Sequence, residues 1–161
     1  MIVVKKSLLT KAVVLIILLS VSFYAYLWIN LRHDKTENSQ LEKITLQVGS
    51  AKIVAEIADS PEELAKGLSG RDSLDADTGM YFILGSSRQA TFHMRGMRFP
   101  LDIIWIDEDK VVGIEKNASI PSASIIPTFV SPQPVTHVLE VNSGFADRER
   151  IKIGDSVEIV R

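Results

Sequence analysis

Residues 101–107 read LDIIWID, and Pro100 stands directly before them. Proline is tolerated at the first position of a strand. The polar residues 107–110 (DEDK) are typical of a turn, and residues 111–114 return as a second strand. Alternation along the first strand assigns Ile103 and Trp105 to one face, and Asp102, Ile104 and Ile106 to the other. This stretch predicts two antiparallel strands and indicates a mainly β domain.

Further short strands are predicted on both sides of this hairpin. Residues 44–48 and 53–57 alternate around the turn Gly49-Ser50, which predicts another hairpin. Residues 79–84 (GMYFIL) are apolar on both faces, as in a central strand. The remaining strands are expected at residues 90–95, 136–141 and 157–160. Seven or eight short strands favour a single β-sandwich or a partly open β-barrel.

One or two short helices accompany the strands. Ser60 and Glu63 are spaced as a capping box, Pro61 suits the first helical position, and Gly67 suits the stop. Residues 144–150 have room for one helical turn. Residues 117–134 hold four of the six prolines and no charge, so we expect a long loop or flap there.

The N-terminal part of the chain is different in kind. Residues 12–31 (AVVLIILLSVSFYAYLWINL) form a run of 20 residues without a charge. A helix of that length spans roughly 30 Å, the thickness of a bilayer core. Tyr24, Tyr26 and Trp28 lie near its end, where aromatic rings favour the lipid–water interface. The run predicts an N-terminal transmembrane helix that anchors the protein in the cell membrane.

Charges around this run predict its orientation. The basic residues Lys5, Lys6 and Lys11 precede it, and only Arg32 and Lys35 follow closely, which favours a cytoplasmic N-terminus and an extracytoplasmic domain. The alternative is export after signal-peptide cleavage near residues 20–22, which leaves the apolar stretch FYAYLWINL at the new terminus. The expected organisation is a basic segment (1–11), the anchor (12–31), a polar linker (32–43) and one β-rich domain (44–161).

Composition excludes several classes of function. The chain has no cysteine, which rules out disulfides, thiolate metal sites and a cysteine nucleophile. Residues 41–161 hold 13 basic and 18 acidic residues, a net charge of −5. Nucleic acid is therefore not an expected partner. No Gly-x-Ser-x-Gly motif and no phosphate-binding loop is present.

Several segments resemble a known family. They are residues 67–71 (GLSGR), 79–82 (GMYF), 92–107 (FHMRGMRFPLDIIWID), 138–144 (VLEVNSG) and 154–155 (GD). In this order, between residues 59 and 158, they resemble the domain of unknown function 192. The resemblance implies a compact, mainly β domain, often behind an export signal or anchor. It implies no established reaction, so no catalytic residue is carried over. One departure is His93, where the family usually has Trp.

Two acids are the candidate chemical groups. Asp102 shares a strand face with isoleucines, so we expect it to be partly buried, either facing a ligand or paired with Arg71, Arg95 or Arg98. Glu140 lies on one strand face with Thr136, Val138 and Asn142, which a solvated face explains. The alternative is that Asp102 and Glu140 form a carboxylate pair for acid–base catalysis.

The other candidates are cationic or aromatic. Arg71 is suited to hold a carboxylate or phosphate, or to form a surface ion pair with Asp72, Asp75 or Asp77. His93 and His137 lack the spacing of metal ligands, and no metal or cofactor is expected. The predicted ligand-binding residues are Arg71, His93, Arg95, Asp102, Trp105 and Glu140.

Three functions fit this pattern. The first is a membrane-anchored extracytoplasmic module that binds a small ligand or an envelope peptide in a concave site, with the segment 117–134 as a flap. The second is an envelope hydrolase using Asp102 and Glu140 with Arg71 as an anion clamp. The third is a structural adaptor for envelope proteins that uses an exposed strand edge. The sequence favours a binding module over an enzyme.

Overall fold

The computed structural model describes the backbone of residues 3–33, 41–122 and 125–160, with side chains for residues 11, 13–28, 41–122 and 125–160. The chain divides into two compact units, residues 1–40 and 41–161. The predicted basic segment and linker lie partly outside the described residues, because residues 1–2 and 34–40 are not among them.

In the first unit the structure describes one long helix, α1 (Val3–His33), of 31 residues. Its described side chains are all exposed, and apart from Lys11, Ser20 and Ser22 they are aliphatic or aromatic. Over the side chains that the structure describes, neither α1 nor any other helix combines the length and the apolarity that a bilayer crossing needs. Residues 12 and 29–31 of the predicted span lie outside these described side chains.

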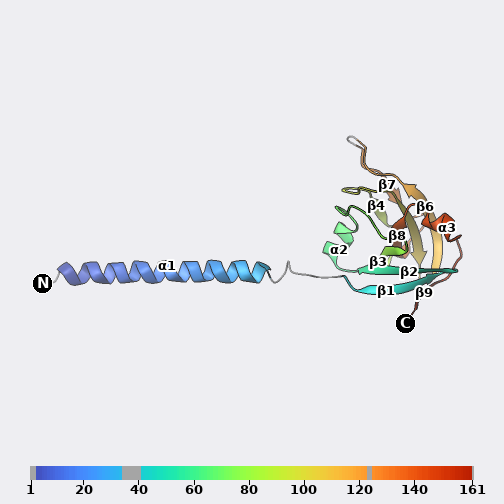
Figure 1. Ribbon diagram of the computed structural model, residues 1–161. Helices are drawn as coiled ribbons and strands as arrows, with labels where there is room; N and C mark the ends of the chain where they lie inside the picture. The colour runs from blue at the N-terminus through green and yellow to red at the C-terminus, as the bar shows by residue number, and fades with distance from the viewer. Residues whose placement is uncertain (1–2, 34–40, 123–124, 161) are drawn as a thin grey trace. The chain divides into compact units, whose positions relative to one another are not determined.

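The second unit is mainly β. A seven-stranded sheet has the order β6-β5-β8-β3-β2-β1-β9 and curls into a half-barrel (Figure 1). A separate two-stranded sheet pairs β4 with β7. The bounds of the nine strands in the described residues are β1 (Lys43–Val48), β2 (Ala51–Ala58), β3 (Thr78–Arg88), β4 (Thr91–His93), β5 (Leu101–Asp107), β6 (Lys110–Ala118), β7 (Thr128–Val130), β8 (Val135–Asn142) and β9 (Val157–Val160).

The two edges of the large sheet approach each other at one end. The Val111 N–H donates to the carbonyl of Asp155 at 3.0 Å, and the Val157 N–H donates to the carbonyl of Asp109 at 2.8 Å. A bridge between Lys110 and Ser156 joins the same segments. The domain is therefore a partly open barrel, the second of the two predicted architectures.

The middle of the large sheet, in β5, β8 and the first half of β3, is buried on both faces. The barrel interior is filled by Leu46, Ile53, Tyr81, Ile104, Leu139 and Phe145 among others. The outer face carries Met80, Phe82, Ile103, Trp105 and Val138, and Leu68, Met94 and Met97 cover it together with the small sheet. The face assignment predicted for residues 103–106 is thus confirmed. A buried outer face means that a polar residue there is also removed from solvent.

The two short helices were correctly located. Helix α2 (Pro61–Lys66) has the predicted capping box: the Ser60 hydroxyl accepts from the Glu63 N–H, and the Glu63 carboxylate accepts from the Ser60 N–H. Gly67 ends the helix at φ 48°, a left-handed value that favours glycine. Helix α3 (Phe145–Arg148) is a single turn.

The prediction of a long loop over residues 117–134 is wrong in part. Residues 117–118 belong to β6, and residues 128–130 form β7, which pairs with β4. Only β4 (Thr91–His93) is strand within the predicted stretch 90–95, because Met97 turns back on Met94 through a backbone hydrogen bond of 3.1 Å. Residues 123–124 of the expected loop lie outside the described residues.

Candidate functional site

Glu140 lies in the middle of the large sheet. In β8 it stands opposite Met80 of β3 on one side and Ile103 of β5 on the other. Its exposed fraction is 5%, so the prediction of a solvated strand face is wrong. The physical reason is that α2, the loop after it and β4 cover this face. Alternation identifies a face but does not reveal what covers it.

Burial changes the acidity of this group. It raises the pKa of Glu140 to about 8, because an apolar environment disfavours the charged form. No described residue forms a hydrogen bond or an ion pair with this carboxyl group. Every described side-chain polar atom that is closed off from solvent has a partner. The Glu140 oxygens are therefore not sealed in the core, and they open onto a pocket.

The pocket has a volume of about 80 Å³. Its walls come from α2 and the loop after it, from Phe82 of β3, and from β4 and the turn that follows. The apolar walls are Leu64, Ala65, Leu68, Phe82, Phe92 and Met97; the polar lining is Lys66, Ser69, Thr91, His93 and Glu140. The pocket thus combines apolar and polar walls with one buried acid, and a concave site with a few polar groups is the usual form of a small-ligand site.

Local hydrogen bonds hold two walls of the pocket together. The Gly70 N–H donates to the carbonyl of Gly96 at 3.0 Å, and the Ser69 hydroxyl donates to the carbonyl of Arg95 at 2.6 Å. A Cβ on Gly67 would lie 3.3 Å from the Phe82 ring, so a larger residue there would crowd the pocket wall. These contacts fix the loop after α2 against the turn after β4.

Aromatic rings support the floor of the pocket. Phe82 and Phe92 meet edge to face with centroids 4.9 Å apart, and Phe92 meets Trp105 in the same way at 5.7 Å. Trp105 is buried behind Phe92 and is not part of the pocket lining. Its predicted role as a direct ligand contact is therefore replaced by support of Phe92.

The structure separates the other predicted site residues. His93 is exposed and lines the pocket, while Arg95 is exposed outside the lining. Arg71 forms a two-pronged ion pair with Glu56 at 3.1 and 2.5 Å, and not with the predicted Asp72, Asp75 or Asp77. This hydrogen-bonded guanidinium holds the pKa of Glu56 below its usual range. Arg71 lines a different hollow, of about 130 Å³.

Asp102 points to the barrel interior, away from Glu140. It stands opposite Val141, while its neighbour Ile103 stands opposite Glu140, so the two carboxylates lie on opposite faces of the sheet. The predicted catalytic pair of Asp102 and Glu140 is therefore wrong. Arg71 is bound to Glu56 at a different hollow. The three residues of the hydrolase hypothesis, Asp102, Glu140 and Arg71, therefore do not share one site.

Backbone amides, and not arginines, bind Asp102. Its carboxylate accepts from the N–H of Asn117 at 2.9 Å and from the N–H of Ala146 at 3.0 Å. Asn117 adopts φ 55° in the left-handed region, and Ala146 lies in α3. Asp102 therefore fastens the end of β6 and the turn α3 to the sheet, so it is buried as a structural group.

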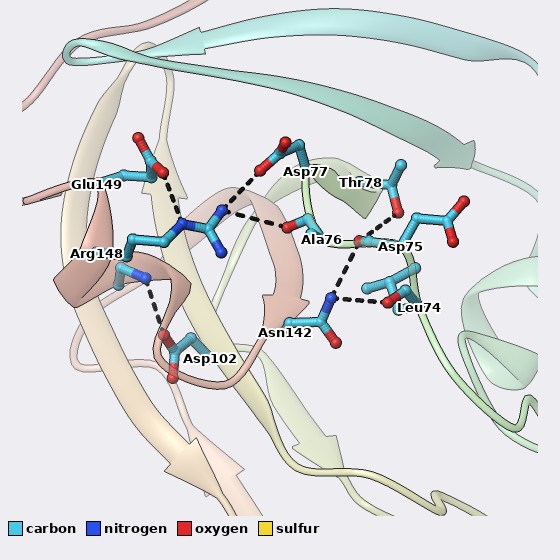
Figure 2. A network of polar contacts seen from close by, with 10 residues as sticks. Leu74, Asp75, Ala76, Asp77, Thr78, Asp102, Asn142, Arg148 and Glu149 are labelled. Atoms are coloured by element: carbon cyan, nitrogen blue, oxygen red, sulfur yellow. Dashed lines mark hydrogen bonds and ion pairs between the residues drawn. The ribbon is translucent and has the colours of Figure 1, made fainter.

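A polar network continues from α3 to the segment before β3 (Figure 2). The Asn142 side chain donates to the carbonyls of Leu74 and Asp75, at 2.9 and 3.0 Å. Arg148 binds the carboxylates of Asp77 and Glu149, at 2.7 and 2.8 Å. All of these polar groups have partners, which marks the network as part of the scaffold.

His137 lies on the inner side of the large sheet, and His93 lies at the pocket on its outer side. His137 stacks on Tyr81 at 5.0 Å and faces the barrel interior side with Ile83 and Ile106. Burial lowers the pKa of His137. In the described parts of the chain, no three or more metal-binding side chains gather together.

Sequence reasoning missed most of the pocket. Leu64, Leu68, Phe82 and Met97 were not predicted as site residues, since apolar side chains in short strands and helices are usually core. A signal was nevertheless present: the segments 67–71, 79–82, 92–107 and 138–144, on which the family resemblance rests, all contribute to this one pocket.

The family DUF192, described as "Uncharacterized ACR, COG1430", matches residues 44–159. The chain belongs to this family. The match confirms the predicted resemblance and extends it to the first strand. No curated protein is similar to the chain.

Two of the solved structures that match the chain are similar to it in fold. One is a Sinorhizobium meliloti 1021 protein described as a "putative transcription regulator", with 28% identity and a TM-score of 0.69 over 76% of this chain and 97% of that chain. The other is a protein of unknown function from Novosphingobium aromaticivorans DSM 12444, with 36% identity and a TM-score of 0.68 over 76% of this chain and 89% of that chain. The matching region makes up almost all of the first of these two chains.

Proposed function

We propose that the chain is a membrane-anchored extracytoplasmic binding module, whose pocket holds a small ligand or a short peptide group against Glu140. The observation that carries the proposal is an acid with 5% exposure that has no hydrogen-bond partner among the described residues and opens onto a pocket. Buried polar groups nearly always have partners. A buried acid that lacks one on the protein side is suited to receive one from a ligand.

The pocket volume limits the ligand. A volume of about 80 Å³ exceeds that of one water molecule, which occupies about 30 Å³ in the liquid. Pockets for drug-sized molecules are larger, about 300–1,000 Å³. We therefore expect the pocket to take one functional group with a short apolar part. The rest of a larger ligand would extend past Thr91 and His93 at the rim.

A thermal-shift screen of residues 41–161 tests this proposal. The probes are short-chain amides, alcohols, carboxylates and amines. A ligand at a hundredfold excess over its dissociation constant should stabilise the domain by about 2.7 kcal/mol. The stabilisation should disappear in Glu140→Leu and persist in Arg71→Ala, which lies outside the pocket. A probe that stabilises both variants equally would place its binding elsewhere.

The membrane anchor is supported by the uncharged run 12–31 and by α1, which continues through it as one helix. We expect the full chain to stay with membranes after an alkaline carbonate wash, and residues 41–161 alone to be released. Protease added outside spheroplasts should digest the domain. A domain protected from that protease, on a chain still bound to membranes, would contradict the proposed orientation.

The structural adaptor remains a second candidate because of one strand. Ile159 and Val160 are 58% and 39% exposed on β9, the last strand of the large sheet. An edge with exposed apolar residues is suited to pair with another chain. An adaptor that used this edge would lose its partner through Ile159→Lys and would be indifferent to Glu140→Leu, so the two candidates are separable.

A further inference from the structure

The pocket presents one donor and one acceptor side by side. A neutral carboxyl group has an O–H donor on one oxygen and an acceptor on the other. Burial raises the pKa of Glu140 to about 8, which favours this neutral form at neutral pH. Neither oxygen has a hydrogen-bond partner among the described residues, so the Glu140 carboxyl group that lines the pocket is available to a ligand.

Charged ligands are poorly matched to the apolar surroundings of Glu140. Glu140 stands between Met80 and Ile103, and the nearest walls are aliphatic and aromatic. The other titratable groups that line the pocket are Lys66 on α2 and His93 on β4. Both are exposed, and a protonated Lys66 repels an incoming ammonium group. Taking an ion from water into an apolar site is costly unless it is paired there.

We propose that the pocket binds a primary carboxamide group, which pairs edge to edge with the neutral carboxyl group of Glu140. The ligand's C=O accepts from the Glu140 O–H, and its N–H donates to the other Glu140 oxygen. The adjoining alkyl part of the ligand packs against Leu68, Phe82 and Phe92. This inference rests on the proposed function and adds the chemical class of the ligand.

Geometry separates a primary carboxamide from other amides. In a primary carboxamide, C=O and one N–H lie on the same side and can meet both carboxyl oxygens. In the trans secondary amide of a peptide bond they point in opposite directions, so only one contact forms. Two sources carry the required group: a free small amide, and the side chain of Asn or Gln in a peptide.

The test measures binding to residues 41–161 by calorimetry, with propionamide as the probe. The matched probes are N-methylpropionamide, which tests the trans amide, and propylammonium, which tests the cation. We expect propionamide to bind most tightly at pH 6. At pH 9.5 a group with a pKa of about 8 is about 3% neutral, so propionamide should bind about thirtyfold more weakly.

Two variants report on Glu140 directly. Glu140→Gln keeps a donor and an acceptor on one edge and does not titrate, so it should retain propionamide binding and lose the pH dependence. Glu140→Leu should lose at least about tenfold in affinity, since both hydrogen bonds are gone. Melting curves of both variants confirm folding, and the pH titration of the unaltered domain tests the inference without any variant.

The outcomes distinguish the inference from the proposed function. Tighter binding of propylammonium, growing from pH 6 to pH 9.5, would overturn the carboxamide and leave the pocket in place. If Glu140→Leu bound propionamide as tightly as the unaltered domain does, both the carboxamide inference and the proposed function would be wrong. To separate the two sources of the carboxamide, the affinity of N-acetylglutamine N-methylamide is compared with that of propionamide. Tighter binding of the glutamine compound indicates a peptide side chain as the ligand, and weaker binding indicates a free amide.

Discussion

Two acidic side chains are buried on adjacent strands of the same sheet, and they differ in their hydrogen-bond partners. Asp102 of β5 is 1% exposed and accepts two backbone N–H groups, from Asn117 and Ala146. Glu140 of β8 is 5% exposed and has no partner among the described residues. Asp102 faces the barrel interior, and Glu140 faces the covered outer side.

The difference shows which buried acid belongs to the scaffold. A carboxylate that accepts backbone N–H groups satisfies them as well as itself, so it stabilises the fold. A carboxyl group whose pKa is raised by burial alone destabilises the fold when it ionises. Such perturbed groups are typical of functional sites. Changing each acid in turn should therefore move stability in opposite directions.

Asp102→Ala should have the largest effect. It leaves the buried N–H of Ala146 and the partly buried N–H of Asn117 without an acceptor, each worth about 1–3 kcal/mol, so we expect a loss of about 4 kcal/mol in the free energy of unfolding. Urea denaturation of residues 41–161 measures this. Asp102→Asn keeps one acceptor oxygen and should lose less. An Asp102→Ala domain as stable as the unaltered one would show that water satisfies both N–H groups.

Glu140→Gln should stabilise the domain at high pH. The folded pKa is about 8 and the model-compound value is 4.5, so the unfolded chain ionises first as pH rises. The unaltered domain then loses stability between about pH 4.5 and pH 8, and Gln does not. Each pKa unit corresponds to about 1.4 kcal/mol.

The advantage of Glu140→Gln should therefore rise by about 4–5 kcal/mol between pH 4 and pH 9, the linkage of a pKa raised from 4.5 to about 8. Because the Gln amide also lacks a protein partner, a penalty of about 1–2 kcal/mol lowers this advantage equally at every pH, which leaves about 3 kcal/mol at pH 9. Thermal denaturation across this range measures the difference between the two proteins, in which the contributions of other titrating groups cancel. A constant difference at all pH values would mean that Glu140 is already ionised in the folded domain.

The sequence predicted the faces of the strands better than their surroundings. Alternation correctly separated Ile103 and Trp105 from Ile104 and Ile106, because side-chain direction has a period of two. The capping box at Ser60 was equally local and correctly predicted. These features depend on neighbours a few residues apart.

The environments of Asp102 and Glu140 depend on contacts far apart in the chain. Glu140 is enclosed because residues 64–69 and 91–97 fold over β8, and Asp102 meets Ala146, 44 residues away. The register that places Ile103 beside Glu140 is also set across β5 and β8. Strand alternation contains none of this pairing, so the predicted Asp102–Glu140 pair was not excluded until the sheet was seen.

Arg71→Ala should have a small effect, because its ion pair with Glu56 is about a third exposed on the Arg71 side. We expect a loss of about 1 kcal/mol or less at pH 7. The ion pair lowers the pKa of Glu56, so its contribution is present above pH 4.5 and is lost as pH falls through the lowered value. Melting curves at pH 7 and pH 3 check this. Altered propionamide binding would instead link Arg71 to the Glu140 pocket.

His93→Trp should have the smallest effect on stability and a clear effect on the pocket. His93 is exposed at the pocket rim, so a larger ring meets no close-packed surroundings, and we expect a change of at most about 1 kcal/mol. The resemblance to domain of unknown function 192 also implies Trp as the usual residue at this position. It adds apolar area beside Phe92 and should tighten the binding of propionamide more than it alters the melting temperature.

The control for His93→Trp is Arg95→Trp, which adds the same ring two residues away, outside the pocket lining. It should leave propionamide binding unchanged. A stability loss of about 1–3 kcal/mol in His93→Trp, the cost of overpacking, together with unchanged binding, would mean that His93 is packed and does not border the ligand. In that case the Glu140 pocket would have to open on the side of Lys66 and Ser69. The difference between Asp102 and Glu140 would be unaffected, because it depends on their hydrogen bonds and not on where the pocket opens.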